Sequence, residues 1–275
     1  MFFKRIVKNT TSRKRGVRRL PFFVAFSLGI GTLQAQNNLS GQMGLMNVPI
    51  ATMPADGTFK IGYNYNPVHY GLRANKKNPE QILYMDLVLL PRLSLNVNFL
   101  QLISTPQYPT REALGDRQID VKYLIMKEGS KKPALAVIMS SPFTIDAAML
   151  TEVLVATKHI ELSKDYELET TLGYGSPIFV WRDVANLENS DIFDGFKVTN
   201  KREYKHYNGY LTGVFAGAKV SYQKKVGIMA EWDSNRMNVG FYATLFKRFT
   251  LQAALLKGDQ VLWGAAYQCP LFKKL

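Results

Sequence analysis

The chain has 275 residues, of which 47% are hydrophobic and 20% charged, so it can bury a sizeable apolar area and is not a disordered segment. Its formal net charge of +14 is concentrated at the N-terminus, where the first 19 residues contain eight Lys and Arg and no acid. Without them the chain has 27 basic and 21 acidic residues, a mild excess that gives little support for nucleic-acid binding.

The N-terminus has the pattern of a secretory signal peptide. The basic stretch leads into the apolar run LPFFVAFSLGIGTL and then into Gln-Ala-Gln around Ala35, which is a basic region, a short apolar region and a small residue at the cleavage site. We place the signal peptide at residues 1–35. A membrane anchor is the alternative, but the run is short for a membrane-spanning helix. The single cysteine, Cys269, excludes an internal disulfide framework.

The next segment, residues 36–57, is a coil punctuated by Pro and Gly that ends in the turn signal Asp56-Gly57. We expect it to be an N-terminal periplasmic segment that reaches the mouth of the domain that follows.

Beyond this segment the apolar residues alternate with polar residues at a period of two, and turn signals separate the alternating runs. The pattern predicts twelve strands, at residues 58–66, 81–89, 93–102, 117–126, 133–141, 150–160, 166–174, 210–222, 225–233, 236–246, 248–257 and 260–269.

The first seven connections between these strands alternate between long and short, and the longest is an outer loop at residues 175–209. All long connections therefore fall at one end of the strands, as in outer-membrane barrels with short periplasmic turns and longer outer loops. The strand faces agree, because one face is almost free of charge while the other is polar. The sequence predicts an all-β fold, a single closed antiparallel up-and-down outer-membrane β-barrel over residues 58–275, with outer-membrane lipid as its surroundings.

The segment GQMGLMNVPIATMPADGTFKIGY resembles the start of the YjbH-like family of outer-membrane proteins associated with exopolysaccharide biosynthesis. The stretches DRQIDVKYLIMKEGSKKPALAVIM, TEVLVATKHI and MNVGFYATLFKRFTLQAALLKGDQVLWGAAYQ are similar to later strands of that family. The resemblance covers most of residues 41–270, with a gap at 175–209. It implies a role in making or exporting surface polysaccharide. The residues that carry the family motif are Gly41, Gly44, Leu45, Pro49, Ala51, Asp56 and Gly57.

Charged residues of both signs are predicted on the lumen face of the barrel. They could line a hydrophilic path for a sugar polymer, or they could pair with one another and keep a narrow barrel filled. We favour the filled barrel, because buried charges need partners and twelve strands leave modest room. The candidate lumen charges are Lys60, Asp120, Lys122, Glu152, Lys158, Glu167, Glu169, Lys219 and Glu231.

The long outer loop interleaves aromatic and basic residues. Aromatic faces could stack on sugar rings and basic groups could pair with acidic sugars, or the aromatics could form a small core of the loop itself. The candidate sugar contacts are Trp181, Arg182, Phe193, Tyr204 and Tyr207.

No pattern predicts a metal site, a cofactor or catalysis. The three histidines lack metal-ligand spacing, and the Ser221-x-x-Lys224 motif lacks the companion motifs of the enzymes that use it. We therefore expect a non-enzymatic barrel that acts in exopolysaccharide biosynthesis or export, with polysaccharide and periplasmic secretion components as partners. The alternatives are a small-solute channel or structural barrel without a polysaccharide role, and an outer-membrane lipid or sugar hydrolase.

Overall fold

The structure is a computed structural model that describes residues 36–73, 77–111, 114–143, 148–183, 194–204 and 207–271. The predicted signal peptide lies outside these ranges. Among the described residues, no helix is long and apolar enough to cross a membrane.

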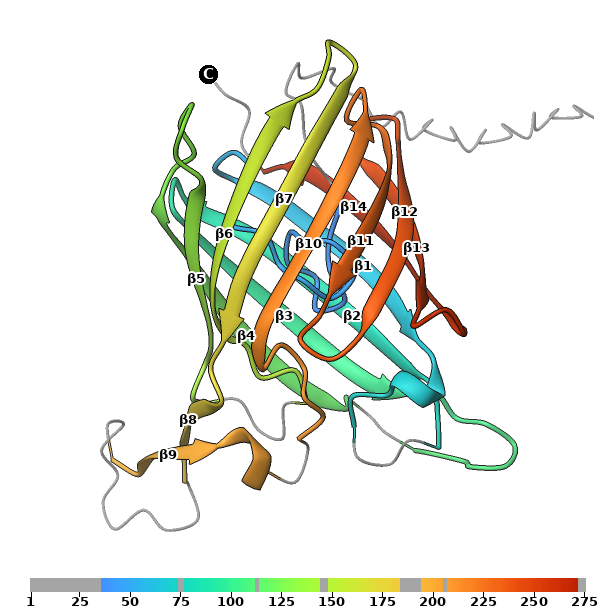
Figure 1. Ribbon diagram of the computed structural model, residues 1–275. Helices are drawn as coiled ribbons and strands as arrows, with labels where there is room; N and C mark the ends of the chain where they lie inside the picture. Colours follow the sequence, from blue (N-terminus) through green and yellow to red (C-terminus); the bar gives the residue numbers. More distant parts are fainter. Residues whose placement is uncertain are drawn as a thin grey trace, which may run out of the picture. The chain divides into compact units, whose positions relative to one another are not determined.

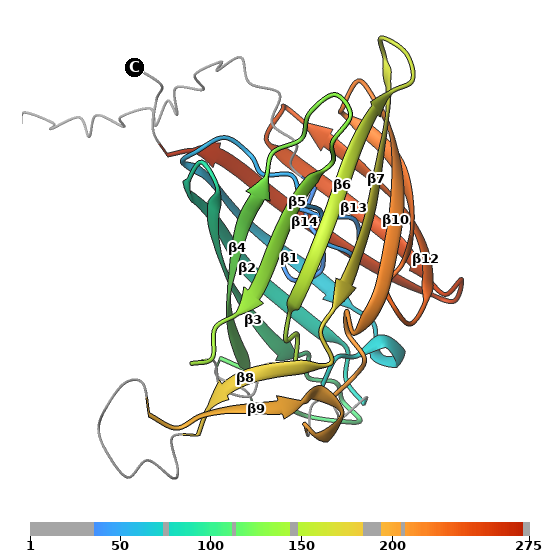
Figure 2. The same cartoon turned by 60° about the vertical axis from the view of Figure 1, so that its left-hand side comes forward.

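Twelve antiparallel strands form a closed barrel (Figures 1 and 2). Every predicted strand is present and its bounds are within three residues of the prediction. The barrel strands are β1 (Thr58–Asn66), β2 (Glu80–Leu90), β3 (Leu93–Leu102), β4 (Asp116–Met126), β5 (Ala134–Ser140), β6 (Glu152–Glu161), β7 (Tyr166–Gly175), β10 (Gly213–Tyr222), β11 (Val226–Trp232), β12 (Met237–Leu245), β13 (Phe249–Leu256) and β14 (Gln260–Pro270).

The barrel closes because its first and last strands pair. β1 and β14 are antiparallel partners from Thr58 opposite Pro270 to Tyr65 opposite Trp263, and every other barrel strand pairs with two neighbours. No edge strand is left with unpaired backbone groups, which is the condition for a sheet to span hydrocarbon. The predicted fold class is confirmed.

The predicted long outer loop contains a small sheet of its own. β8 (Ile178–Arg182) and β9 (Phe196–Asn200) form a two-stranded antiparallel sheet outside the barrel. As a result, β7 pairs directly with β10 although about 40 residues of chain separate them in sequence. Among the described residues of the outer connections, Val68–Tyr70 and Lys201–Glu203 form 3-10 turns.

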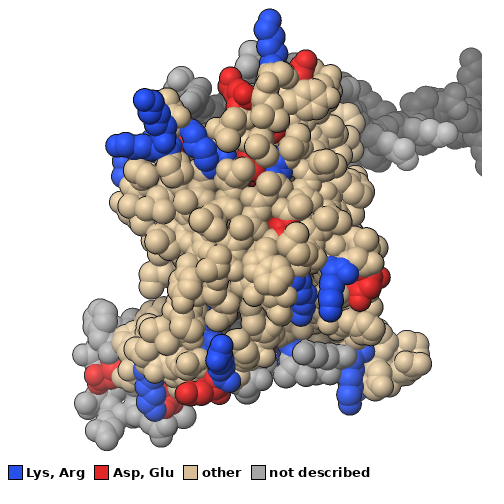
Figure 3. All heavy atoms as spheres, in the orientation of Figure 1, with Lys and Arg blue, Asp and Glu red and all other residues tan. Residues whose placement is uncertain are grey.

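The outer wall of the barrel is apolar. Along β4, Ile119, Val121, Tyr123 and Ile125 are exposed and alternate with buried polar residues. In Figure 3 the charged side chains gather towards the two ends of the barrel, while the band between them is mostly uncharged. A wall of this kind, on a barrel without edges, is typical of an outer-membrane barrel, and we expect it to face lipid.

A charge at the centre of this wall tests its contact with lipid. Val121 is the central residue of β4 and is 38% exposed, whereas Val198 in β9 is 66% exposed but lies outside the barrel. We expect Val121→Arg to lower the free energy of unfolding in lipid vesicles by about 2–4 kcal/mol and Val198→Arg to change it by less than about 0.5 kcal/mol. Urea titration of both variants measures the difference, and equal small effects would contradict a lipid-facing wall.

Candidate functional site

The lumen of the barrel is filled by the chain's own N-terminal segment. Residues 36–51, the lumen plug, are all buried. Their contacts come from strands on opposite sides of the barrel, among them β1, β4, β6 and β11. Figures 1 and 2 show this blue segment looping inside the ring of strands.

One carboxylate holds the centre of the lumen plug. Glu231 on β11 accepts hydrogen bonds from the backbone N–H groups of Met46 (3.0 Å), Asn47 (2.9 Å) and Val48 (3.1 Å). Asn238 on β12 also donates to Glu231, at 3.1 Å. Consecutive backbone N–H groups that converge on one carboxylate form an anion-binding nest, and hydrogen bonds to an ionised acceptor are the strong ones.

The far end of the lumen plug is held by β4 and β6. Lys122 Nζ donates to the carbonyl oxygens of Ile50 (2.6 Å) and Thr52 (2.7 Å). The backbone N–H of Ala51 donates to Thr157 Oγ1 at 2.8 Å. Lys122 therefore binds backbone carbonyl groups at this end, while Glu231 binds backbone N–H groups at the centre. Buried donors and buried acceptors of the plug both find partners on the barrel wall.

The beginning of the lumen plug is bound to β1. Lys60 Nζ donates to Asn37 Oδ1 at 3.0 Å, and Asn64 Nδ2 donates to the carbonyl oxygens of Asn38 and Leu39 at 3.0 and 2.9 Å. Asn38 in turn accepts from the backbone N–H of Gln42 at 2.9 Å. The plug is thus both folded on itself and attached to the wall.

The family-motif glycines fit the lumen plug into the available space. Gly41 has φ +94°, and a Cβ at this position would overlap the ring of Tyr84. Gly44 sits in a fold-back that is closed by the hydrogen bond from Leu45 N–H to the Val48 carbonyl, 2.8 Å, and by a bridge to Pro49. Only glycine has no side chain to place in these positions.

The wall has matching glycines. A Cβ at Gly217 on β10 would overlap the Leu45 side chain, and one at Gly240 on β12 would lie 2.7 Å from the sulfur of Met46. Leu45 and Met46 are both buried. Apolar side chains of the plug therefore fill hollows that small wall residues leave open.

The position of residues 36–57 corrects one prediction. We expected a periplasmic segment, but residues 36–51 lie in the lumen, where polar side chains of the wall pair their backbone groups. Residues 52–57 lead from the lumen plug to the start of β1 and include the motif residues Asp56 and Gly57, of which Gly57 has φ +69°.

Most of the candidate lumen charges are buried on the inner face. They either bind the lumen plug or pair with one another, as Lys219 does with Glu169 at 2.9 Å. Glu167 pairs with Lys224 of the β10–β11 turn at 2.9 Å. The buried ones are Lys60, Asp120, Lys122, Glu167, Glu169, Lys219 and Glu231.

Two candidate lumen charges are on the other face. In β6 the residues Thr157 and His159 contact lumen groups, so Glu152 and Lys158 share the outward parity of Leu154. Glu152 pairs with Lys201 at 2.7 Å, and Lys158 with Glu128 at 2.8 Å. The prediction was wrong for these two. Charged residues occur at both odd and even positions of β6, so the sequence alone does not show which set faces the lumen, and the register with the neighbouring strands is needed.

Several inward residues were not among the candidates. His159 bridges Glu169 (2.9 Å) and Glu128 (2.6 Å), and Asp86 on β2 is buried opposite Lys60. The alternation along β1 and β2 places Asn64, Tyr84 and Asp86 on the lumen face, so this signal was available. No local pattern indicated that a coil would be their partner.

The outer mouth is covered by loops. Asn208 Nδ2 donates to the carbonyl oxygens of Leu72 (2.6 Å) and Ala148 (2.7 Å), which joins three outer connections. Tyr210, also in this cover, donates its hydroxyl to the carbonyl oxygen of Asn47 at 3.4 Å. The cover and the lumen plug therefore touch.

The candidate sugar contacts of the outer loop serve the loop's own packing. Trp181 Nε1 donates to Thr199 Oγ1 at 2.8 Å, and the Tyr204 ring packs against Phe179 at 5.1 Å. Arg182 donates to the Asp194 carbonyl at 3.0 Å. Tyr207 is the one with an exposed side chain, and Phe193 lies outside the described residues.

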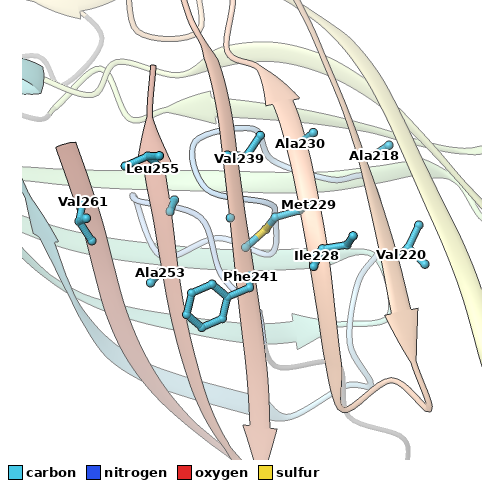
Figure 4. A pocket seen from close by; sticks show the side chains of 12 residues that line it. Ala218, Val220, Ile228, Met229, Ala230, Val239, Phe241, Ala253, Leu255 and Val261 are labelled. Atoms are coloured by element: carbon cyan, nitrogen blue, oxygen red, sulfur yellow. The ribbon is translucent and has the colours of Figure 1, made fainter. Parts of the chain in front are cut away.

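A hollow of about 610 Å³ lies on the outer wall across β10 to β14. Figure 4 shows two rows of side chains that cross these strands, with Ala218, Ala230 and Val239 in one and Val220, Ile228 and Phe241 in the other. Its lining is almost wholly apolar, which suits hydrocarbon and gives a polar ligand few partners. Among the described residues, no group of His, Cys, Asp and Glu could hold a metal ion.

Residues 36–274 match the family model of the exopolysaccharide biosynthesis protein YbjH, the YjbH family. The chain belongs to this family, and the matched range begins with the lumen plug. No curated protein gives a match.

Similar solved structures include an outer membrane channel from Pseudomonas putida F1, with 13% identity, a TM-score of 0.37 and coverage of 79% of this chain and 96% of that chain. A second is the KdgM porin, with 9% identity, a TM-score of 0.39 and coverage of 78% and 99%. Likeness at this level does not transfer a substrate or an activity.

The close fit of Gly41 is testable against a second glycine. Gly41 and Gly258 both have positive φ, but a Cβ at Gly258 would meet nothing within 4 Å. We expect Gly258→Ala to cost only the backbone strain of about 1–2 kcal/mol and Gly41→Ala to cost a further 1–3 kcal/mol, roughly, from overpacking. Urea unfolding of both variants measures this, and equal losses would show that Tyr84 does not close on Gly41.

The hold of Glu231 on the lumen plug is testable by thiol labelling. A Leu45→Cys probe in a Cys269→Ser background reports the opening of the plug. Glu231→Gln replaces one carboxylate oxygen by an amide donor that faces backbone N–H groups, and a hydrogen bond to a charged group contributes about 1.5–3 kcal/mol. We expect labelling by a maleimide to accelerate at least about tenfold, whereas the control Glu152→Gln leaves it unchanged. An unchanged rate in Glu231→Gln would contradict the assigned role.

Proposed function

We propose that this protein acts in exopolysaccharide production from the outer membrane as a barrel with a closed lumen, and that it organises polymer or secretion components without catalysing a reaction itself. Membership of the YjbH family supports the polysaccharide role. The observation that carries the closed state is the lumen plug, which Glu231, Lys122 and Lys60 hold through its backbone and side chains.

A passive small-solute channel fits this lumen poorly. The plug residues are buried, the outer cover is attached to them by Tyr210, and the cavities at the outer mouth are about 20 Å³ each. A cavity of that size holds about one water molecule. An open porin-like bore would need both the plug and the cover to move.

A hydrolase also finds little support. Ser221 of the S-x-x-K motif is buried and accepts a hydrogen bond from the Tyr242 hydroxyl at 2.9 Å, while Lys224 pairs with Glu167. A serine nucleophile requires a base within hydrogen-bond reach, and here the lysine is engaged by a carboxylate.

The polysaccharide role is tested by deletion and complementation. We expect a strain without this protein to lose surface exopolysaccharide and the wild-type protein to restore it. Unchanged polymer in the deletion strain would contradict the proposed role.

A locked plug separates a closed scaffold from a conduit that opens. Because the end of the Leu45 side chain reaches Gly217, we choose Leu45→Cys with Gly217→Cys, in a Cys269→Ser background, as the pair for a disulfide from plug to wall. Loss of both free thiols on oxidation shows that the disulfide has formed. We expect the oxidised protein to restore polymer as well as the reduced protein and the single Leu45→Cys control do. Failure that is reversed by reduction would show that the plug must leave and would overturn the closed scaffold.

A further inference from the structure

The turns at the periplasmic end of the barrel are strongly basic. The five short turns that join β2–β3, β4–β5, β6–β7, β10–β11 and β12–β13 contain nine basic and two acidic residues, and each turn has at least one base. They are Arg92, Lys127, Lys131, Lys132, Lys164, Lys224, Lys225, Lys247 and Arg248, against Glu128 and Asp165.

The opposite end is more balanced. The described parts of the outer connections, with β8 and β9 included, have nine basic and five acidic residues. They are Arg73, Lys77, Arg111, Arg182, Lys197, Lys201, Arg202, Arg236 and Lys257, against Asp183, Asp194, Glu203, Asp233 and Asp259. The excess of positive charge is therefore greater at the rim where the chain enters the barrel.

The β4–β5 turn concentrates this charge. Lys127, Lys131 and Lys132 are exposed, and none of them has a carboxylate partner among the described residues. In Figure 3 basic side chains gather over the end of this hairpin. Exposed lysines that have no ion pair are available to an anionic ligand.

The one acid of this turn is already neutralised. Glu128 accepts from Lys158 at 2.8 Å and contacts His159 Nδ1 at 2.6 Å. Partial burial alone would raise the pKa of Glu128, but the hydrogen bonds from Lys158 and His159 outweigh it and hold the pKa below its usual range. Its charge is thus committed to internal partners and does not offset the three lysines.

A groove at the periplasmic mouth includes Lys127, the first of these lysines, in its lining. It has a volume of about 730 Å³ and is lined on one side by residues 52–57, where the chain leaves the lumen, and on the other by Leu89, Pro91, Lys127 and Glu128. The volume is in the range of ligand sites. Its lining combines apolar groups such as Met53, Pro54 and Leu89 with the ammonium group of Lys127 and the carboxylates of Asp56 and Glu128. The apolar groups suit the C–H faces of a sugar. The positive charge for an acidic sugar comes from the exposed lysines of the turn, since Glu128 is paired internally.

We infer that this groove and the basic turns around it bind an anionic, carboxylate-bearing polysaccharide at the periplasmic face of the barrel. The inference rests on the proposed function, since it names the class of polymer. Bases spread over five turns match a polymer with a repeating charge, because several weak contacts along one chain add to its avidity. The barrel would hold such a polymer at the membrane while its own lumen stays closed.

The test measures polymer binding by the full-length protein in nanodiscs of zwitterionic phosphatidylcholine. Polygalacturonate is the anionic probe and dextran the neutral one. The variant is Lys127→Glu with Lys131→Glu and Lys132→Glu. Its control makes the same change in net charge at the other end, with Arg111→Glu, Arg202→Glu and Lys257→Glu. Heat-dependent gel mobility shows that both variants are folded barrels.

We expect the wild type to bind polygalacturonate and not dextran, with an affinity that falls as salt rises. The rim variant, with Lys127→Glu, Lys131→Glu and Lys132→Glu, should bind polygalacturonate at least tenfold more weakly. The affinity of the control variant should stay within twofold of that of the wild type. Equal binding by the rim variant and the wild type, an equal loss in the control, or equal binding of dextran would each overturn the inference.

Two further results keep this inference separate from its alternatives. If the protein in nanodiscs with phosphatidylglycerol binds polygalacturonate as well as it does in neutral discs, lipid headgroups do not occupy the groove. A rim variant that fails to bind polymer but fully restores exopolysaccharide in the deletion strain would overturn the inference and leave the proposed function in place.

Discussion

The structure depends on one constraint, namely that the backbone of a coil enclosed by a barrel must find a hydrogen-bond partner for every buried polar group. The carboxylate of Glu231, which accepts from three consecutive N–H groups, meets this constraint at the centre of the lumen plug. Lys122 meets it for the carbonyls at the far end, and Asn64 for those at the beginning. Without these side chains, buried backbone groups of the plug would lose hydrogen bonds that water supplies outside the lumen.

Because of this constraint, the lumen charges have a role that differs both from lining an open path for a polymer and from pairing only with one another. They do not line an open path, and only some of them pair with one another, as Lys219 and Glu169 do. Others pair with the backbone of the plug. The filled-barrel hypothesis was correct in outcome, but the filling is a segment of chain and not a set of ion pairs alone.

The sequence was sufficient for the barrel because its information is local. Alternation along β1 or β4 defines the two faces, and Gly-, Asn- and Lys-rich turns define the ends of strands. The lumen plug was beyond such patterns, because its contacts join Met46 to Glu231 and Ala51 to Thr157, pairs that are far apart in sequence. Glu152 and Lys158 show the same limit within one strand. β6 has charged residues at odd and even positions, and only its register with β7 shows which of them face the lumen.

The family motif acquires a physical meaning in this fold. Gly41, Gly44, Leu45, Pro49 and Ala51 shape a coil that matches the lumen, and Gly217 and Gly240 shape the wall that receives it. The match to the family model begins with this coil, and in this chain the coil closes the lumen. The closed lumen is the reason why we propose a role in surface-polymer production and not the free diffusion of small solutes.

The most direct test of the lumen plug is the conductance of single barrels in planar bilayers. The protein from Gln36 onwards should show no stable ion-conducting state, whereas the same protein lacking residues 36–51 should show steady conductance through an unobstructed lumen. A steady open state in the complete protein, or no change on removal of these residues, would contradict the account.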